Sequence, residues 1–158
     1  MIRKDRQVTN PKEMRAFLDA CDVVRVAMCD GEFPYIVPLS FGWDWEGEFP
    51  RIYVHGAPSG YKVELLKANP HVCVEFDRFI RYDQIKHGIT ARYQSLIGRG
   101  IAYELNEPEE KSKALRRLCE HCGYKLFDPA DCGSLAHTKT WRIDVSELSA
   151  KQNLRKLS

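Results

Sequence analysis

The sequence has no long hydrophobic run and no large excess of either charge. No apolar segment approaches the roughly 18 residues needed to cross a bilayer, and the opening residues MIRKDRQVTNPKEM lack the apolar centre of a secretory signal. The 24 basic and 22 acidic side chains leave a net charge of +2, so no overall field attracts a polyanion. We therefore expect a soluble, cytoplasmic protein that binds neither nucleic acid nor a membrane.

The cysteines are not densely packed, and repeats are absent. The six cysteines are scattered along 158 residues without the dense spacing of a small disulfide-stabilised secreted domain, so we predict free thiols. The sequence has neither internal repeats nor low-complexity tracts, and it lacks the alternating strand–helix pattern of a parallel α/β fold. Its length suits one domain with a sizeable core, and we predict a single domain over residues 1–158.

The hydrophobic periodicity predicts a mainly β protein with peripheral helices. Helical spacing of apolar residues marks three segments, residues 9–20, 61–68 and 108–122. Alternation rich in β-branched and aromatic residues marks six strands, residues 23–28, 35–43, 51–56, 71–77, 93–105 and 140–148. The polar segment 78–92 is predicted to be a loop, and Gly98 and Gly100 indicate a bulge or a close backbone approach within a strand. We expect a small antiparallel barrel.

The stretch IYVHGAPSGYK, residues 52–62, has the features of a phosphate site. Gly56 and Gly60 leave backbone N–H groups accessible between a strand and a helix, and the helix N-terminus attracts anions. Lys62 would lie in the first helical turn, where the helix dipole disfavours a cation unless an anion is near. The motif is not a Walker loop, and the alternative interpretation is a polar turn with a solvated lysine.

Several segments, in this order and spacing, resemble the pyridoxamine 5′-phosphate oxidase-related flavoproteins, and in particular the Nim-like branch associated with resistance to 5-nitroimidazole antibiotics. They are YIVPL at 35–39, IYVHGA at 52–57, GYK at 60–62, LLKANP at 65–70 and SLIGRGIA at 95–102. The resemblance spans nearly the whole chain. It implies a six-stranded antiparallel split β-barrel of the Greek-key type, and a homodimer that binds FMN in two clefts at the subunit interface.

The resemblance also assigns residues to the flavin ring. Two neighbouring strand segments would border the isoalloxazine, namely Val37, Pro38, Leu39 and Ser40 on one strand and His55, Gly56 and Ala57 at the end of the next. The final strand would approach the cofactor at Trp141 and Arg142, and Ser95 would reach it from the partner subunit.

The phosphate of FMN is assigned to the loop after the second of these strands. Lys62 matches the basic residue that binds the phosphate, with Ser59 and Tyr61 on the same loop. A dianionic phosphate favours such a lysine together with N–H donors, and a planar ring favours an apolar slot with a few polar contacts. The chain departs from the true oxidases, which have an Arg-Lys pair in place of Tyr61-Lys62 and C-terminal substrate residues that are not found here. Oxidation of pyridoxamine phosphate is therefore disfavoured.

His55 is the candidate catalytic residue. A histidine beside the ring could donate a hydrogen bond, deliver a proton after hydride transfer or bind an acidic substrate, although it could equally be a structural histidine. The resemblance implies an FMN-dependent oxidoreductase that passes electrons from a reduced nicotinamide cofactor to a small acceptor, with nitroaromatics among the candidates. The alternative is a non-catalytic carrier or sensor that holds a flavin, a deazaflavin or haem.

A second cluster suggests a zinc site. Cys119, His121 and Cys122 lie close together in the sequence, and Cys132 and His137 follow, which supplies enough thiolate and imidazole ligands for tetrahedral zinc. Against this, the first cysteines fall near the end of a predicted helix, no second CxxC follows, and buried free cysteines are common in protein cores. We predict no metal, and a redox CxxC is disfavoured because no thioredoxin-like βαβ unit surrounds it.

Overall fold

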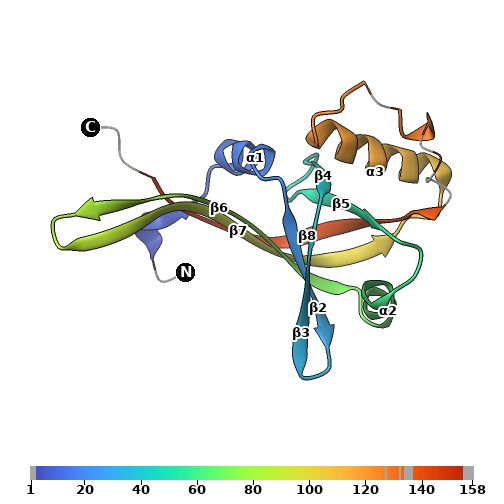
Figure 1. The fold of residues 1–158 in the computed structure, drawn as a ribbon, viewed down its shortest axis with the longest axis horizontal. Helices are drawn as coiled ribbons and strands as arrows, with labels where there is room; N and C mark the ends of the chain where they lie inside the picture. Colours follow the sequence, from blue (N-terminus) through green and yellow to red (C-terminus); the bar gives the residue numbers. More distant parts are fainter. Residues whose placement is uncertain (1–2, 127, 132, 134–136, 155–158) are drawn as a thin grey trace.

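The computed structural model describes residues 3–126, 128–131, 133 and 137–154. Within them, one antiparallel sheet is accompanied by α-helices and short 3-10 turns (Figure 1). The strands are β1 (Gln7–Val8), β2 (Val24–Asp30), β3 (Phe33–Leu39), β4 (Phe41–Asp44), β5 (Arg51–Gly56), β6 (His71–Ile85), β7 (Gly88–Glu104) and β8 (Lys139–Asn153). The helices are α1 (Pro11–Asp19), α2 (Tyr61–Ala68) and α3 (Pro108–His121), with 3-10 turns at Lys4–Arg6 and Pro129–Asp131.

The three predicted helices are confirmed, and local sequence explains where they begin. At α1 the side chain of Asn10 accepts a hydrogen bond of 2.9 Å from the N–H of Lys12, and Pro11 occupies the first turn. At α3 Pro108 is again in the first turn, followed by two glutamates that the helix dipole favours. None of the helices in the described part of the chain is long and apolar enough to cross a bilayer.

The two edge strands of the sheet, β3 and β4, are consecutive in the chain, and their connection closes the sheet into a barrel. The strand order is β3-β2-β6-β7-β8-β5-β4, with β1 beside β8, so β3 and β4 form opposite edges although only Ser40 separates them. Leu39 pairs with Val24 on one side of this junction, and Phe41 pairs with Val54 on the other. The predicted single strand 35–43 is therefore two strands, and with β1 the described sheet has eight strands rather than six.

The predicted loop at 78–92 is wrong. These residues form the outer part of the β6–β7 hairpin, which runs past the barrel as a two-stranded arm (Figure 1). The ladder skips one residue between Phe79 and Arg81, and this bulge shifts the alternation that sequence analysis relies on. Polar side chains line one face of the arm, where Arg81 and Arg92 both bind Asp83. In the sequence, the shifted alternation and the charged residues of this face therefore made residues 78–92 look like a polar loop.

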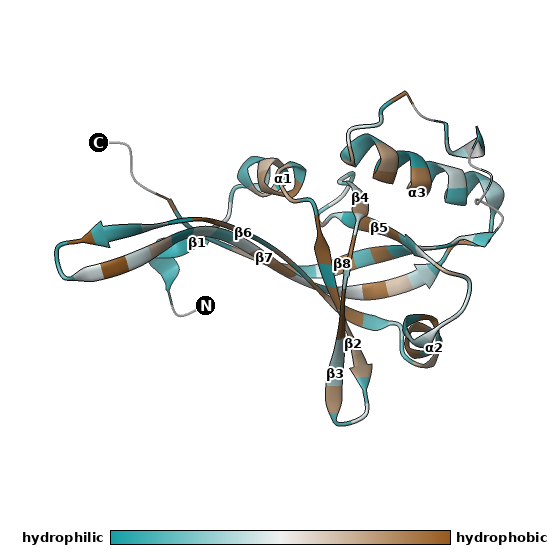
Figure 2. Ribbon diagram, viewed as in Figure 1, coloured by the Kyte–Doolittle hydropathy of each residue, from teal (hydrophilic) through white to brown (hydrophobic). Residues whose placement is uncertain are grey.

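The glycines of β7 confirm the predicted irregularity. The pairing with β8 shifts register between Arg99 and Gly100, and a Cβ at Gly100 would lie 2.4 Å from the carbonyl oxygen of Asp144. The barrel interior is filled by inward-facing residues from all the long strands. Its largest fully buried side chains include Trp141, Phe41 and Phe76. Figure 2 shows hydrophobic residues concentrated on β2, β3 and α2, with further hydrophobic bands along the arm.

Candidate functional site

The end of β5 and the start of α2 are joined by an exposed loop, which is the predicted phosphate site. Gly60 precedes the helix with φ of 125°, a conformation that glycine adopts without strain, and no side chain caps the helix. The N–H groups of Val63 and Glu64 bond to the carbonyl of Gly60, whereas those of Tyr61 and Lys62 lie in the first turn, where helical N–H groups have no partner within the helix. The predicted phosphate loop therefore has free donors.

Lys62 folds back over the end of β5 and is not a solvated side chain. Its ammonium would lie 2.5 Å from a Cβ at Gly56, so only glycine leaves the lysine this position. The same nitrogen is 5.9 Å from the centroid of the buried Trp141 ring. Burial lowers the pKa of Lys62, and among the described residues no carboxylate forms an ion pair with it. A half-buried cation without a counter-ion favours an anionic ligand.

His55 and its neighbour across the sheet are both left with unsatisfied polar atoms. His55 pairs with Thr140 of β8, and within the described residues neither His55 Nδ1 nor the Thr140 hydroxyl has a hydrogen-bond partner, although both atoms are buried. Such groups normally bond to protein, water or ligand. Burial, followed by the nearby positive charge of Lys62, lowers the pKa of His55, so the imidazole is neutral at pH 7.

The β3–β4 junction also lies near the end of β5, and it connects this end to β3 at the other edge of the sheet. Because Phe41 pairs with Val54, Ser40 follows beside His55 at the end of β5. Val37 and Leu39 alternate with the exposed Pro38 on β3 and are half-buried. Val37 and Leu39 pack against the core cluster that contains Trp141, and Ser40 lies near the end of β5 that Lys62 covers. Ala57 and Ser59 lie on the exposed loop between β5 and α2.

Tyr61 fixes this loop to the β2–β3 hairpin. Its hydroxyl donates a 2.5 Å hydrogen bond to Oδ1 of Asp30, and its ring meets the ring of Tyr35 edge-on with 5.2 Å between centroids. The hydrogen bond to Asp30, more than burial, raises the pKa of Tyr61. Sequence analysis did not find Asp30 or Thr140, because their roles depend on pairing across the sheet, which no local pattern indicates.

Two predicted site residues lie apart from this group. Arg142 alternates with Trp141 along β8 and points to the α3 side, where it binds Asp144 at 2.8 Å and Glu110 at 3.5 Å. Ser95 pairs with Lys151, which lies about 36 Å along β8 from Thr140 at ~3.3 Å per residue. Within one chain, Ser95 cannot contact a ligand held by Lys62.

The predicted cysteine–histidine cluster does not assemble in the described residues. His121 Nε2 lies 2.7 Å from the carbonyl oxygen of Cys21, and the imidazole packs on Phe41 with 4.3 Å between ring centroids. No group of three potential metal ligands is found among the described residues. Cys21, Cys29, Cys73 and Cys122 are free thiols within the described residues, and Cys132 lies outside the described residues.

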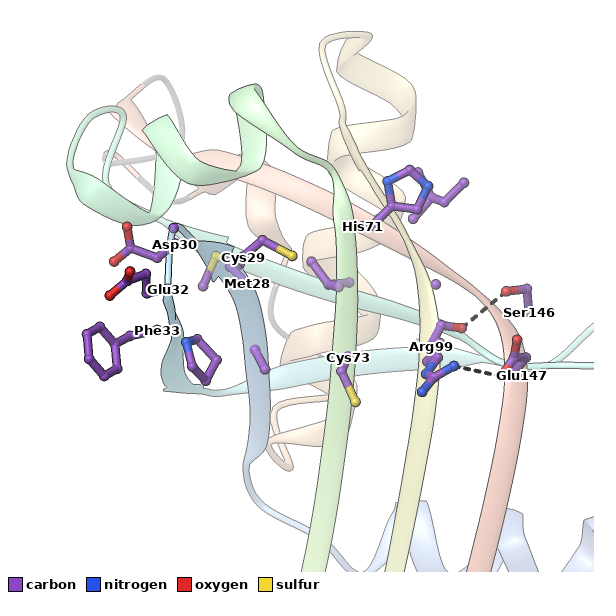
Figure 3. A pocket seen from close by; sticks show the side chains of 16 residues that line it. Met28, Cys29, Asp30, Glu32, Phe33, His71, Cys73, Arg99, Ser146 and Glu147 are labelled. Carbon is purple, nitrogen blue, oxygen red and sulfur yellow. Dashed lines mark hydrogen bonds and ion pairs between the residues drawn. The ribbon is translucent and has the colours of Figure 1, made fainter.

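A cavity of about 670 Å³ lies beside the β2–β3 turn, and Asp30, the hydrogen-bond partner of Tyr61, is part of its lining (Figure 3). The turn between β2 and β3 forms one wall, and β6, β7 and β8 form the floor and the other wall. None of the predicted cofactor residues lines it. The β2–β3 hairpin therefore contacts both the predicted phosphate loop, through Tyr61, and the cavity.

A family model described as pyridoxamine 5′-phosphate oxidase matches residues 10–152. The chain belongs to the pyridoxamine 5′-phosphate oxidase family. This family binds flavins, and its members are often flavin oxidoreductases. The match includes β2 to β8 and the whole loop between Gly56 and Lys62.

Known proteins agree with this assignment. A curated relative, the uncharacterized protein RA0666 of Rhizobium meliloti (strain 1021), is 31% identical over 91 residues. The match covers 57% of this chain and 57% of that relative's length, so the chain spans only part of the relative. A crystal structure from Bacteroides thetaiotaomicron, whose name proposes a 5-nitroimidazole antibiotic resistance protein, has a TM-score of 0.79 and 26% identity over 92% of this chain and 85% of that one. The FAD and heme binding protein of Mycobacterium smegmatis has a TM-score of 0.74 at 16% identity, over 95% of this chain and 74% of that one, and so shows the fold alone. The predicted split β-barrel is confirmed.

Proposed function

We propose that this protein is an FMN-dependent oxidoreductase of the Nim-like group, which acts as a homodimer on a small acceptor such as a nitroaromatic compound and takes electrons from a reduced nicotinamide cofactor. The observation that carries the proposal is the half-buried Lys62 ammonium, which lies beside an uncapped helix start without a carboxylate partner in the described residues. A phosphate monoester supplies the charge that this loop lacks.

The residues present fit FMN. Lys62 and the N–H groups at the start of α2 would hold the phosphate, and the edge of β3 from Val37 to Ser40 would border the ring. His55 would donate or accept through its unsatisfied Nδ1. FMN, when bound, supplies the hydride and electron chemistry. The chain's own residues bind and orient the cofactor and exclude water from one of its sides.

His55 has the properties of a proton donor and acceptor at this site. Its lowered pKa leaves the imidazole neutral at pH 7, so it can accept a proton as a base and, once protonated, return that proton as an acid. The nearby ammonium of Lys62 is one cause of this lowered pKa, and neutralisation of that ammonium by a phosphate would raise it again. Phosphate binding and the basicity of His55 are coupled in this way.

The homodimer completes the proposed site. Ser95 lies about 36 Å along β8 from the pairing position of His55, at ~3.3 Å per residue, so its predicted contact with the flavin requires a second subunit. Arg142 adjoins Trp141 on β8, but its guanidinium points to the α3 side, so the proposed site does not include it.

The visible absorption spectrum of the purified protein tests the proposal. We expect a flavin spectrum, release of FMN on denaturation, and oxidation of NADH or NADPH in the presence of a nitro, quinone or flavin acceptor. A colourless protein that does not bind added FMN would refute it. FMN binding without turnover would instead favour a carrier or sensor, a candidate that the shared fold of the FAD and heme binding protein supports.

A further inference from the structure

Thr140 and His55 form a directly opposed pair where β8 meets β5. Their Cα atoms are partners in the antiparallel sheet, so both side chains leave the same face with Cβ atoms about 4.5–5.5 Å apart. Thr140 is 1% exposed, and its hydroxyl has no hydrogen-bond partner among the described residues. Nδ1 of His55 is likewise buried and has no partner there. Two buried polar atoms that lack partners thus belong to neighbouring side chains.

The polar groups of the next pair on this face are already engaged. Tyr53 and Arg142 are partners one step further along β5 and β8. The Tyr53 hydroxyl donates a 2.7 Å hydrogen bond to Asp44, and the Arg142 guanidinium binds Asp144 at 2.8 Å. Neither group is available to the His55 ring, which leaves that ring with the hydroxyl on the opposite strand.

Charged groups near the pair do not supply an acceptor or donor for Nδ1. Glu104 and Lys139 form an ion pair of 2.5 Å. However, Lys139 directly precedes Thr140, and Glu104 is paired with the residue that follows it, so both lie on the opposite face of the sheet. After burial, the ammonium of Lys62 is what lowers the pKa of His55. This ammonium forms no hydrogen bond to the ring in the described structure.

The hydrogen-bonding capacity of the two groups decides the direction of a bond between them. A threonine hydroxyl has one donor and two lone pairs, whereas each nitrogen of a neutral imidazole either donates or accepts. If the hydroxyl donates to Nδ1, its proton and the Nδ1 lone pair are both satisfied. If Nδ1–H donates instead, the hydroxyl proton stays buried without an acceptor, which costs free energy. The first arrangement is favoured, and it leaves the ring proton of neutral His55 on Nε2.

Nε2 is the ring nitrogen with access to a ligand. It has no hydrogen bond to any described residue, and unlike Nδ1 it is not among the buried atoms that lack a partner. His55 directly precedes Gly56, over which the Lys62 ammonium lies. A ligand bound by Lys62 would therefore be at the same end of β5 as Nε2. The hydrogen bond of one ring nitrogen sets what the other can offer such a ligand.

We propose that Thr140 is a positioning residue for His55, because its hydroxyl donates to Nδ1 and so holds the neutral ring with Nε2–H free to donate to the ligand. The two atoms are not bonded in the structure, and a change of the Thr140 χ1 rotamer or a rotation of the ring spans the distance between paired Cβ atoms. This proposal rests on the proposed function, in which Nδ1 of His55 donates or accepts, and it names the group with which Nδ1 does so.

The same hydroxyl serves the protonated ring. Once His55 carries a second proton, Nδ1–H donates to the lone pairs of the Thr140 oxygen, which a hydroxyl allows and a methyl group does not. Nε2–H points to the ligand in both states. It is a donor held in place before the reaction, and such donors stabilise negative charge that develops on a ligand atom.

Nitrogen NMR of His55, with and without FMN, tests the bond. In the wild type we expect the proton of the neutral ring on Nε2, and an Nδ1 resonance shifted by the hydrogen bond that it accepts. Thr140→Val keeps the size of the side chain and removes the hydroxyl, so the Nδ1 resonance should move to that of a nitrogen without a hydrogen bond. Thr140→Ser should restore it. Thr9→Val, at an exposed threonine before α1, is the matched control.

Turnover tests whether Thr140 acts through His55. With saturating FMN, Thr140→Val should lower kcat about 2- to 10-fold, the worth of one hydrogen bond, and Thr140→Ser should recover most of it. FMN affinity should not change. In the His55→Ala background, Thr140→Val should have no further effect, because the two substitutions remove the same interaction. Thr140→Ala also lacks the hydroxyl and should reproduce each result, and urea unfolding checks that all variants are folded.

The outcomes separate this proposal from the proposed function. An active flavoprotein whose Nδ1 resonance and kcat are unchanged by Thr140→Val would overturn the role of Thr140 and leave the function intact. A proton on Nδ1 in the neutral wild-type ring would overturn it as well, as would a loss of FMN affinity without a change at Nδ1. A protein that shows the bond but binds no flavin would support the positioning of His55 and reject the function.

Discussion

The ammonium nitrogen of Lys62 lies 5.9 Å from the centroid of the Trp141 ring. The two residues meet because β5 pairs with β8, which places Trp141 opposite Val54, and because Gly56 has no side chain to keep the lysine away. An ammonium held by an aromatic face is stabilised without a carboxylate. It can turn to an incoming phosphate without breaking an ion pair, and the proposed function therefore makes Lys62 the residue on which phosphate recognition would depend.

Replacement of this lysine should discriminate between FMN and riboflavin. A hydrogen bond to a charged group contributes about 1.5–3 kcal/mol, so Lys62→Ala should lower the affinity for FMN about 10- to 100-fold. Riboflavin lacks the phosphate, and its affinity should change little. Flavin fluorescence titration of the apoprotein measures both. Lys67→Ala, on the exposed last turn of the same helix, is the matched control, and an equal loss for both flavins would contradict the assignment.

Removal of the imidazole of His55 should affect turnover more than flavin retention. Proton transfer by a positioned side chain contributes about 10²–10⁴-fold to rates, so His55→Ala saturated with FMN should lose at least about 100-fold in kcat. FMN affinity should fall less than with Lys62→Ala, because His55 does not hold the phosphate. His71→Ala, an exposed histidine at the start of β6, serves as the control. Unchanged turnover with greatly weakened flavin binding would make His55 a structural residue.

Much of the fold follows from the sequence. Asn10 caps α1, and Pro108 occupies the first turn of α3, as the sequence predicted for the two helix starts, and the strand patterns from Val24 to Gly56 were predicted within a few residues. The arm at residues 79–92 was missed because a bulge at Ile80 and charged residues on one face disguised the two-residue period. Ser40 was placed inside a strand because no local signal shows that the chain passes from one sheet edge to the other there.

The candidate site was predictable only in part. The loop from Gly56 to Lys62 has a local signature, and in the structure its Lys62 ammonium lies over the Trp141 ring. The positions of Arg142, Thr140 and Asp30 depend on strand register and on which face of β8 meets α3. These are properties of the assembled sheet, so they cannot be derived from residue spacing along the chain.

The stability of the protein should depend on His55 below neutral pH. The folded-state pKa of His55 lies below its ordinary value of 6.5, so the unfolded chain binds the proton more readily than the native one. Stability should therefore be undiminished above pH 6.5 and should fall as the pH drops below it toward the folded-state value. His55→Gln should flatten this part of the curve of unfolding free energy against pH, measured with urea, and His71→Gln should not. A steeper fall in His55→Gln would contradict the sign of the shift, which NMR titration of the imidazole measures directly.

The packing of α3 on the edge of the sheet depends on a glycine in β4. A Cβ at Gly42 would lie 2.3 Å from the backbone nitrogen of Leu118 and 2.4 Å from the carbonyl carbon of Arg117. Backbone atoms cannot rotate away, so Gly42→Ala must push the whole helix outward and open the contact over Tyr53 and Ala114. Overpacking of this kind costs about 1–3 kcal/mol, and the urea midpoint should fall accordingly.

Gly47→Ala is the matched control for this substitution, because no atom lies within 4 Å of the added methyl group. Its effect should stay within about 0.5 kcal/mol, as for other surface changes. Because α3 lies on the opposite side of β5 and β8 from Lys62, Gly42→Ala should also leave the FMN affinity of the folded protein close to that of the wild type. Equal midpoints for the two variants would show that α3 does not pack directly on β4, whereas a loss of FMN binding at full stability would mean that the helix is part of the cofactor site.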